Sequence, residues 1–153
     1  MPSTHAMATN VDQPDKPASA PLAKFIDTLF EQHPDLLGVL LTDAEGIPML
    51  FQARENQPEL ACDPNVNTHL VQATDNLHHI GFCTPLATLS QGERFQYVHF
   101  NCQPIQCLLI AELDANLGRL LALKPQFEYR LQPVRTKVAR LTSHSIASSG
   151  FQD

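Results

Sequence analysis

The sequence contains no tryptophan and only two tyrosines, so its large packing surfaces must come mainly from eight phenylalanines. Its four cysteines include no C-x-x-C pair, and reduced thiols in a cytosolic protein are the expectation. No N-terminal stretch joins a basic region to an apolar run, as a secretory signal would. No run approaches the roughly 18 apolar residues of a membrane span, and Pro2 stands where a myristoylation signal needs glycine. We therefore expect no direct membrane insertion, and any membrane residence must come through a partner.

Positive charge is also scarce, with ten Lys and Arg against sixteen Asp and Glu and a formal net charge of −6. Binding to nucleic acid without sequence preference needs clustered cations that neutralise phosphates, so this function is disfavoured. Residues 117–141 nevertheless carry six cations and only Glu128, a local charge of +5 that leaves −11 for the remainder. The last segment of the chain is a basic strip on an acidic body.

Polar stretches lie at both ends of the chain. Residues 1–20 carry Pro2, Pro14 and Pro17 among small polar residues, which bury too little apolar surface to offset the entropy of ordering. We expect a disordered N-terminal extension at 1–20, a single domain at 21–142 and a flexible C-terminal tail at 143–153. A domain of roughly 120 residues is large enough for one hydrophobic core.

The first half of the domain has the pattern of a helix followed by a β-hairpin. Apolar residues recur at helical spacing within 21–34, which predicts an amphipathic helix of about three turns. Strands are predicted at 36–41 and 47–51, joined by a turn at Gly46. Pro48 has no amide hydrogen, so the second strand should lie at a sheet edge.

A second helix and a three-strand meander follow. Asp63-Pro64 has the form of an N-cap with proline in the first turn, and Gly81 ends the apolar repeat that follows. Strands are predicted at 86–91, 95–100 and 105–111. If the fifth strand lies beside the first, all strands share one antiparallel sheet of order 2-1-5-4-3.

The last helix of the domain begins near Leu117, after capping residues. Pro125 and Pro133 each remove a backbone hydrogen bond and clash with the preceding turn, so a kinked or two-piece helix is expected. Its second piece presents an apolar row made of Phe127, Leu131, Val134, Val138 and Leu141.

This order of elements resembles the roadblock domain, a profilin-like α/β sandwich. Within that family, five segments resemble the MEK-binding scaffold subunits of Ragulator complexes in order and spacing: TDAEGIPML, ENQPE, LVQATDNLHHIG, FQYVHFNCQP and LLIAELDANLG. The resemblance covers residues 22–142. It implies a five-stranded antiparallel sheet of order 2-1-5-4-3 with helices on both faces.

The resemblance also implies a non-enzymatic scaffold or adaptor that uses no cofactor or metal. Such a subunit would form a heterodimer with a second roadblock subunit, inside a complex wrapped by a lipid-anchored Ragulator subunit. It would help to recruit Rag GTPases and the MAP-kinase components MEK and ERK in mTOR-pathway signalling. Its place would be the cytoplasmic face of late endosomes and lysosomes, reached through partners, and otherwise the cytoplasm. The alternative is a homodimeric roadblock regulator of a small GTPase or of the dynein motor.

The residues themselves give a physical reason to expect pairing. The strand at 86–91 has no internal proline and would leave one side of its backbone unpaired at a sheet edge, which favours another chain. The apolar row of the second helix is close to an a/d pattern, which suits a partner helix and the chain's own sheet equally well. The predicted interface comprises Val66, Leu70, Ala73, Leu77, Leu86, Ala87, Thr88, Leu89, Ser90 and Gln91.

An enzyme is the weaker interpretation. A cysteine hydrolase needs a thiolate within reach of a histidine, but no family signature surrounds the candidates, which are Cys62 with Asp63 and His69, and Cys83 with His78 and His79. Neighbouring histidines project about 100° apart on a helix and cannot clamp a metal alone. The turn at 43–46 lacks the remaining oxygen ligands of a calcium loop.

The basic strip has two interpretations. Arg130, Lys137 and Arg140 lie away from the apolar row of the last helix, which is how a solvated helix face looks. Alternatively, they form a docking surface for an acidic partner.

Overall fold

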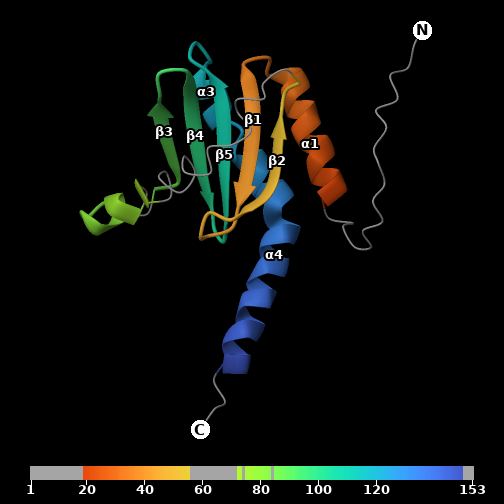
Figure 1. Ribbon diagram of the computed structural model, residues 1–153, viewed down its shortest axis with the longest axis vertical. Helices are drawn as coiled ribbons and strands as arrows, with labels where there is room; N and C mark the ends of the chain where they lie inside the picture. The colour runs from red at the N-terminus through yellow and green to blue at the C-terminus, as the bar shows by residue number, and fades with distance from the viewer. Residues whose placement is uncertain (1–18, 56–71, 74, 84, 150–153) are drawn as a thin grey trace.

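The computed structural model describes residues 19–55, 72–73, 75–83 and 85–149. Within these ranges the chain forms five strands and three principal helices (Figure 1). In chain order the elements are α1 (Ser19–Gln32), β1 (Leu36–Thr42), β2 (Pro48–Ala53), β3 (Ala87–Gln91), β4 (Phe95–Cys102), β5 (Ile105–Glu112), α3 (Leu117–Leu121) and α4 (Lys124–Ser149).

The strands form one antiparallel sheet in the order β2-β1-β5-β4-β3, which confirms the predicted topology. β5 lies in the centre and is buried along its whole length except at Glu112, which explains its nearly continuous apolar sequence. β2 and β3 are the two edges. Pro48 is the first residue of β2 and lies on an edge strand, as its missing amide hydrogen requires.

Helices α1, α3 and α4 contribute to one hydrophobic core with one face of the sheet. Three phenylalanines join the layers: the Phe127 ring of α4 lies 5.2 Å from Phe25 of α1 and 5.9 Å from Phe100 of β4, centroid to centroid. All three side chains are buried. In a chain without tryptophan, this aromatic cluster supplies the large packing surface between the helices and the sheet. On the other face of the sheet, Leu37, Leu108 and Ile110 form a second, smaller cluster.

The C-terminal helix is in two pieces, as predicted. α3 ends at Leu121 and α4 begins at Lys124, so Pro125 lies in the first turn of α4, where its missing amide has no intrahelical acceptor to lose. Pro133 lies inside the second piece.

The helix limits differ from the sequence prediction at both ends of the domain. α1 begins at Ser19, so Ser19 and Ala20 are helical and do not belong to the extension predicted at 1–20. α4 continues to Ser149, so residues 143–149 of the C-terminal tail predicted at 143–153 are helical. The reason is that the first helix-breaking residue after Pro133 is Gly150.

Part of the second predicted helix is described. Residues 72–73 and 75–79 are helical, and Gly81, at φ 96°, follows the last turn. The Gly81 amide donates to His78 O and the Phe82 amide donates to Leu77 O, the paired bonds of a glycine-terminated helix end. Gly81 therefore ends this helix, as predicted. The predicted start at Asp63-Pro64 lies outside the described residues.

Arg54, just after β2, ties the end of α1 to the start of β1. Its Nε donates to Leu36 O at 2.6 Å, and its Nη2 donates to His33 O at 2.7 Å and also to Phe30 O. The guanidinium also lies 5.2 Å from the centroid of the Phe30 ring. Carbonyls at a helix C-terminus have no amide donor within the helix, and a nearby cation is favourable there. The Arg54 side chain thus donates hydrogen bonds to three carbonyls around the turn that joins α1 to β1.

We expect Arg54→Met to lower the free energy of unfolding by about 2 kcal/mol, because it leaves part-buried carbonyls without their charged donor. Arg54→Lys should recover only part of this loss, since an ammonium group lacks the planar fork of guanidinium. Urea unfolding of the purified chain measures both. Arg119→Met, at an exposed position of α3, is the control and should change stability by less than about 0.5 kcal/mol. An equal loss in both variants would show that the carbonyl contacts of Arg54 are unimportant.

Candidate protein interface

β3 is an open edge of the sheet. It pairs with β4 from Ala87↔Phe100 to Gln91↔Gln96, and no other described strand lies on its second side. The Gly92 amide donates to Phe95 O at 2.9 Å, and the Asn101 amide donates to Leu86 O at 3.1 Å. These two bonds set the alternation of the antiparallel ladder.

The alternation determines which backbone amides and carbonyls of β3 point away from β4. Thr88 and Ser90 exchange their bonds with β4, so the amides and carbonyls of Ala87, Leu89 and Gln91 point away from the sheet. A row of such groups at an edge is a template for another strand.

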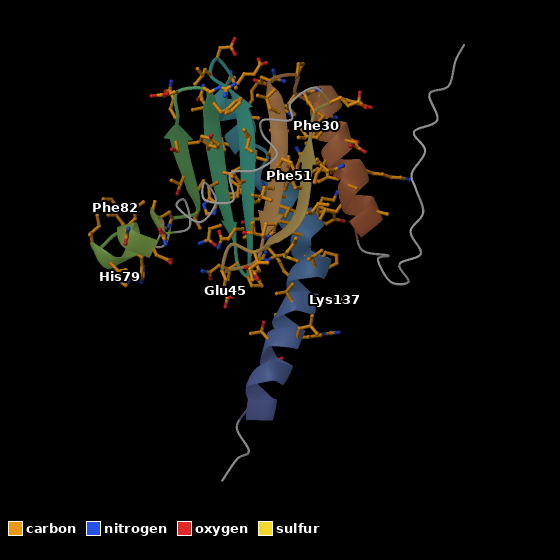
Figure 2. The ribbon with its side chains drawn as sticks, viewed as in Figure 1. Phe30, Glu45, Phe51, His79, Phe82 and Lys137 are labelled. Atoms are coloured by element: carbon orange, nitrogen blue, oxygen red, sulfur yellow. The ribbon has the colours of Figure 1, made fainter. Side chains whose placement is uncertain are left out.

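Large apolar side chains lie exposed on β3 and on the segment that leads into it. Leu86 is 69 % exposed and Leu89 is 45 % exposed, while Ile80 and Phe82 are 70 % and 61 % exposed. Figure 2 shows His79 on the short helical segment next to β3, and Phe82 just after the end of that segment. Exposed apolar side chains gathered at one place mark an interaction site more often than single ones do. We call Ile80, Phe82, Leu86 and Leu89 the edge patch.

The sequence-predicted interface is placed only in part. All of its β3 members lie on the open edge strand or directly before it, Ala73 is exposed and Leu77 is half-buried. Val66 and Leu70 lie outside the described residues. The predicted set omitted Ile80 and Phe82. The sequence signal for these two residues was their position on either side of Gly81, between the end of a helix and the start of a strand, where bulky apolar residues have no place in a predicted core.

The opposite edge carries exposed apolar residues of its own. Ile47, Met49 and Phe51, which alternate along the chain up to and along β2, are 57 %, 40 % and 37 % exposed. Pro48 lies among them and donates no hydrogen bond, which makes this edge a poorer template for strand addition. The two edges are therefore similar in apolar exposure and different in backbone chemistry.

Next to β3, buried polar side chains lie without hydrogen-bond partners. His99 of β4 pairs in register with Thr88 of β3 and with Leu108 of β5, and it is 1 % exposed. Both of its ring nitrogens, Thr88 Oγ1 and Gln106 Oε1 are buried and unpartnered. Burial lowers the pKa of His99, and the Gln106 side chain opposes this without making a hydrogen bond of ordinary geometry to the ring. This site is uncharged at neutral pH.

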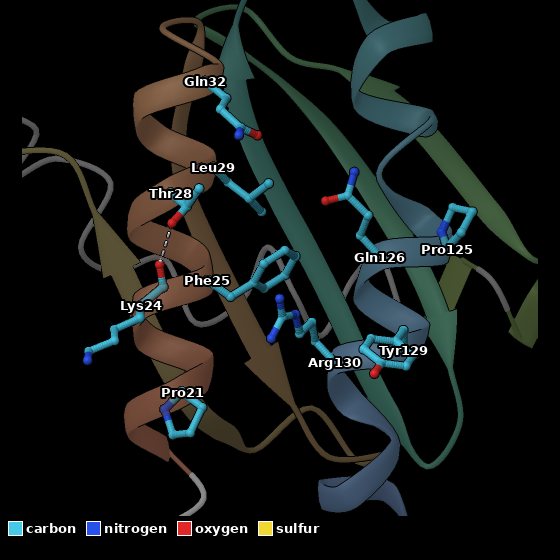
Figure 3. Close-up of a pocket in the computed structure, with 10 residues that line it drawn as sticks. All are labelled: Pro21, Lys24, Phe25, Thr28, Leu29, Gln32, Pro125, Gln126, Tyr129 and Arg130. Atoms are coloured by element: carbon cyan, nitrogen blue, oxygen red, sulfur yellow. Dashed lines mark hydrogen bonds between the residues drawn. The ribbon is translucent and has the colours of Figure 1, made fainter.

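A groove of about 690 Å³ runs between α1 and the start of α4 (Figure 3). Phe25 and Leu29 contribute apolar surface to it, and Lys24, Tyr129 and Arg130 are exposed residues along it. The Arg130 guanidinium lies 5.4 Å from the Phe25 ring centroid and 6.0 Å from that of Tyr129. Arg130, one of the predicted docking cations, is thus held against its own helices' aromatic rings.

The thiols of the sheet are unsuited to nucleophilic chemistry. Burial raises the pKa of Cys102 and raises that of Cys107 well above its usual range, so both are held as neutral thiols. Cys83 is exposed, and the rings of His78 and His79 lie with centroids 6.2 Å apart. Cys62, Asp63 and His69 lie outside the described residues.

The described part of the chain holds neither a metal-binding cluster nor a membrane-spanning helix. No group of three or more His, Cys, Asp or Glu side chains there is placed to hold a metal ion. None of the helices described is both long and apolar enough to cross a membrane.

Comparisons with known proteins agree with this geometry. The family described as "Mitogen-activated protein kinase kinase 1 interacting" matches residues 21–138. The Ragulator complex protein LAMTOR3-B of Xenopus laevis is 32 % identical over 101 residues, which are 64 % of this chain and 82 % of that protein. The LAMTOR3 homolog of Drosophila melanogaster is 24 % identical over 117 residues, 76 % of this chain and 94 % of that protein.

Solved structures show the same fold. The gliding protein mglB of Thermus thermophilus superposes with a TM-score of 0.65 at 12 % identity, covering 81 % of this chain and 95 % of that one. A roadblock/LC7 domain from Streptomyces avermitilis superposes with a TM-score of 0.51 at 11 % identity, covering 71 % and 92 %. At such identities the likeness shows the fold alone, and that fold is the roadblock sandwich expected from the sequence.

The buried His99 makes stability depend on pH. Because its pKa is lower in the folded chain than the ordinary 6.5, the unfolded chain binds the proton more readily, and stability falls as pH decreases from about 6.5 towards the lowered value. We expect His99→Leu to flatten this slope between pH 7.5 and 5.5, and to raise the free energy of unfolding at neutral pH by about 1 kcal/mol, since an unpartnered polar group is removed. Urea unfolding at several pH values measures both quantities. His79→Leu, at an exposed position, is the control; a steeper or unchanged slope in His99→Leu would contradict the assignment.

Proposed function

Because the chain belongs to the family described as "Mitogen-activated protein kinase kinase 1 interacting", we propose that it is a non-enzymatic scaffold subunit of a Ragulator-like complex. In this role it pairs with a second roadblock subunit along β3. The observation that carries the proposal is the open edge of β3, with its outward amides and carbonyls and the adjacent edge patch.

Both β3 and the helical segment that precedes it could contact a partner. A partner strand would bond to the outward groups of Ala87, Leu89 and Gln91, and its side chains would cover Leu86 and Leu89. The neighbouring helical segment, with Ile80 and Phe82 at its end, would pack on the corresponding segment of the partner. Strand addition alone is weakly selective, because every chain has the same backbone, so the edge patch would supply the discrimination.

The wider role is argued from relatives. Proteins named as Ragulator complex subunits match this chain over 82 % to 94 % of their own length, so the matched region is most of each of those proteins. In the proposed assembly the chain is held by a lipid-anchored subunit and presents composite surfaces to Rag GTPases and to MEK or ERK. It acts at the cytoplasmic face of late endosomes and lysosomes, in mTOR and MAP-kinase signalling.

Size-exclusion chromatography with light scattering separates this proposal from the self-pairing alternative. A chain of 17.0 kDa that is monomeric or poorly soluble alone, and that forms a stable 1:1 complex when co-expressed with a second roadblock subunit, is the expected result. A stable homodimer that does not exchange with the second subunit would contradict heterodimer formation and favour a self-pairing regulator of a small GTPase or of dynein.

Leu89→Lys should weaken the heterodimer by about 2 kcal/mol, or roughly 30-fold in Kd, because it places a charge in the middle of the proposed interface. The fold of the chain itself should be unaffected, since the Leu89 side chain is 45 % exposed in the isolated chain. Met49→Lys is the matched control on the other edge strand, where the side chain is 40 % exposed. Isothermal titration with the purified partner compares the two. Equal weakening by both substitutions, or by neither, would remove β3 from the interface.

A further inference from the structure

α4 extends beyond the body of the protein. Leu131 is fully buried, Val134 packs against the core, and Arg135 Nε donates to Gln103 O in the β4–β5 turn at 2.9 Å. From residue 139 to 143 every side chain is exposed. Figure 1 shows the helix leaving the sheet here, and the family match ends at residue 138 while the helix continues to Ser149. This projecting helix is a feature that the family match does not cover.

The apolar row of α4 has heptad spacing. Its members, separated by four, three, four and three residues, are Phe127, Leu131, Val134, Val138 and Leu141. Phe127 and Leu131 are used by the chain's own core, whereas Leu141 is 64 % exposed. Two helices pack along such a row by inserting side chains into each other's holes. Phe127, Leu131 and Val134 are thus satisfied within the molecule, whereas Val138 is half-buried and Leu141 lies in solvent.

Cations lie along both sides of this row. The expectation that Arg130, Lys137 and Arg140 all lie away from the row holds only for Arg140, which points roughly 140° from its centre at 100° per residue. Arg130 and Lys137 flank the row on one side and Arg135 on the other. These flanking positions choose the partner of a paired helix by charge. The sequence has no Asp or Glu between Tyr129 and Ser149, and among the described side chains neither Lys137 nor Arg140 has an ion-pair partner.

We infer that the row from Val134 to Leu141 docks an amphipathic helix of a partner protein that carries Asp or Glu beside its apolar row. Lys137 sets the choice of partner and Leu141 is the apolar anchor. Figure 2 shows Lys137 on the part of α4 that lies beyond the sheet. This docking does not depend on pairing through β3, because no residue of the row lies on that strand.

Charge and composition favour this occupant over two others. The same helix of a second copy would place Arg130, Arg135 and Lys137 against themselves, which is repulsive. Binding in a lipid surface scales with buried apolar area, and Leu141 is the only large apolar residue in the exposed stretch 139–143. The docking row is only about 10 Å long, so the contact is weak alone and is strengthened where another contact already holds the partner.

The test uses the full-length chain and a labelled synthetic helix of four heptads with Leu at the a and d positions and Glu at the e and g positions. Fluorescence anisotropy should show binding that Lys137→Glu weakens about tenfold and that Leu141→Gln weakens similarly. Arg140→Glu carries the same charge change on the same helix but points away from the row, so it should alter Kd less than twofold. A peptide with Lys at the e and g positions should bind Lys137→Glu better than it binds the natural chain.

Other outcomes overturn the inference. No binding of the Glu peptide, or equal weakening by Lys137→Glu and Arg140→Glu, would leave only unspecific attraction between charges. Stronger binding to vesicles of phosphatidylcholine with phosphatidylserine than to the peptide, lost in Leu141→Gln, would assign the surface to lipid. A concentration-dependent dimer of the chain that Leu141→Gln abolishes would assign it to a second copy.

Discussion

The unpaired backbone on the outer side of β3 is the constraint from which the rest of the molecule follows. Each strand between the edges has neighbours on both sides, so its amides and carbonyls are satisfied within the sheet. At β3 no described strand pairs with the outward groups of Ala87, Leu89 and Gln91. Each hydrogen bond to a partner strand replaces one to water, so its net contribution is only about 1 kcal/mol or less. Strand addition alone is therefore a weak attraction. The exposed side chains of the edge patch supply the area that makes such a contact specific.

The two edges of the sheet differ in how well each could accept a partner strand. Both edges carry exposed apolar residues, and Met49 and Leu89 are nearly equal in exposure. β2 nevertheless begins at Pro48, which has no amide hydrogen, and its register with β1 shifts between Leu41 and Thr42. A shifted ladder and a proline both interrupt the template that a partner strand needs. An uninterrupted backbone, more than apolar exposure, distinguishes β3.

The sheet order was predictable because Pro48 assigned one edge, and a hairpin followed by a meander left few ways to bring five strands together. Pro125 likewise predicted the break before α4. The helical residues 143–149 were missed, because their polar composition suggests a tail and the absence of a breaker is a weak signal. The carbonyl contacts of Arg54 and the unpartnered burial of His99 arise only when distant segments meet, so no local pattern contains them. The edge position of β3 was predictable, since it is a property of topology, whereas two of the four helical residues of the predicted interface, Val66 and Leu70, lie outside the described residues.

α4 couples the stability of the domain to association. Its first turns are fixed by the packing of Phe127 and Leu131, which overcomes the unfavourable nucleation that keeps isolated short helices marginal in water. Residues beyond Val138 extend a helix that is already nucleated, so each adds one hydrogen bond without that cost. Residues 139–143 gain no burial in return, since all of their side chains are exposed. A helix packed on Leu141 would supply the missing burial, so the length of ordered α4 and the occupancy of its row are linked in both directions.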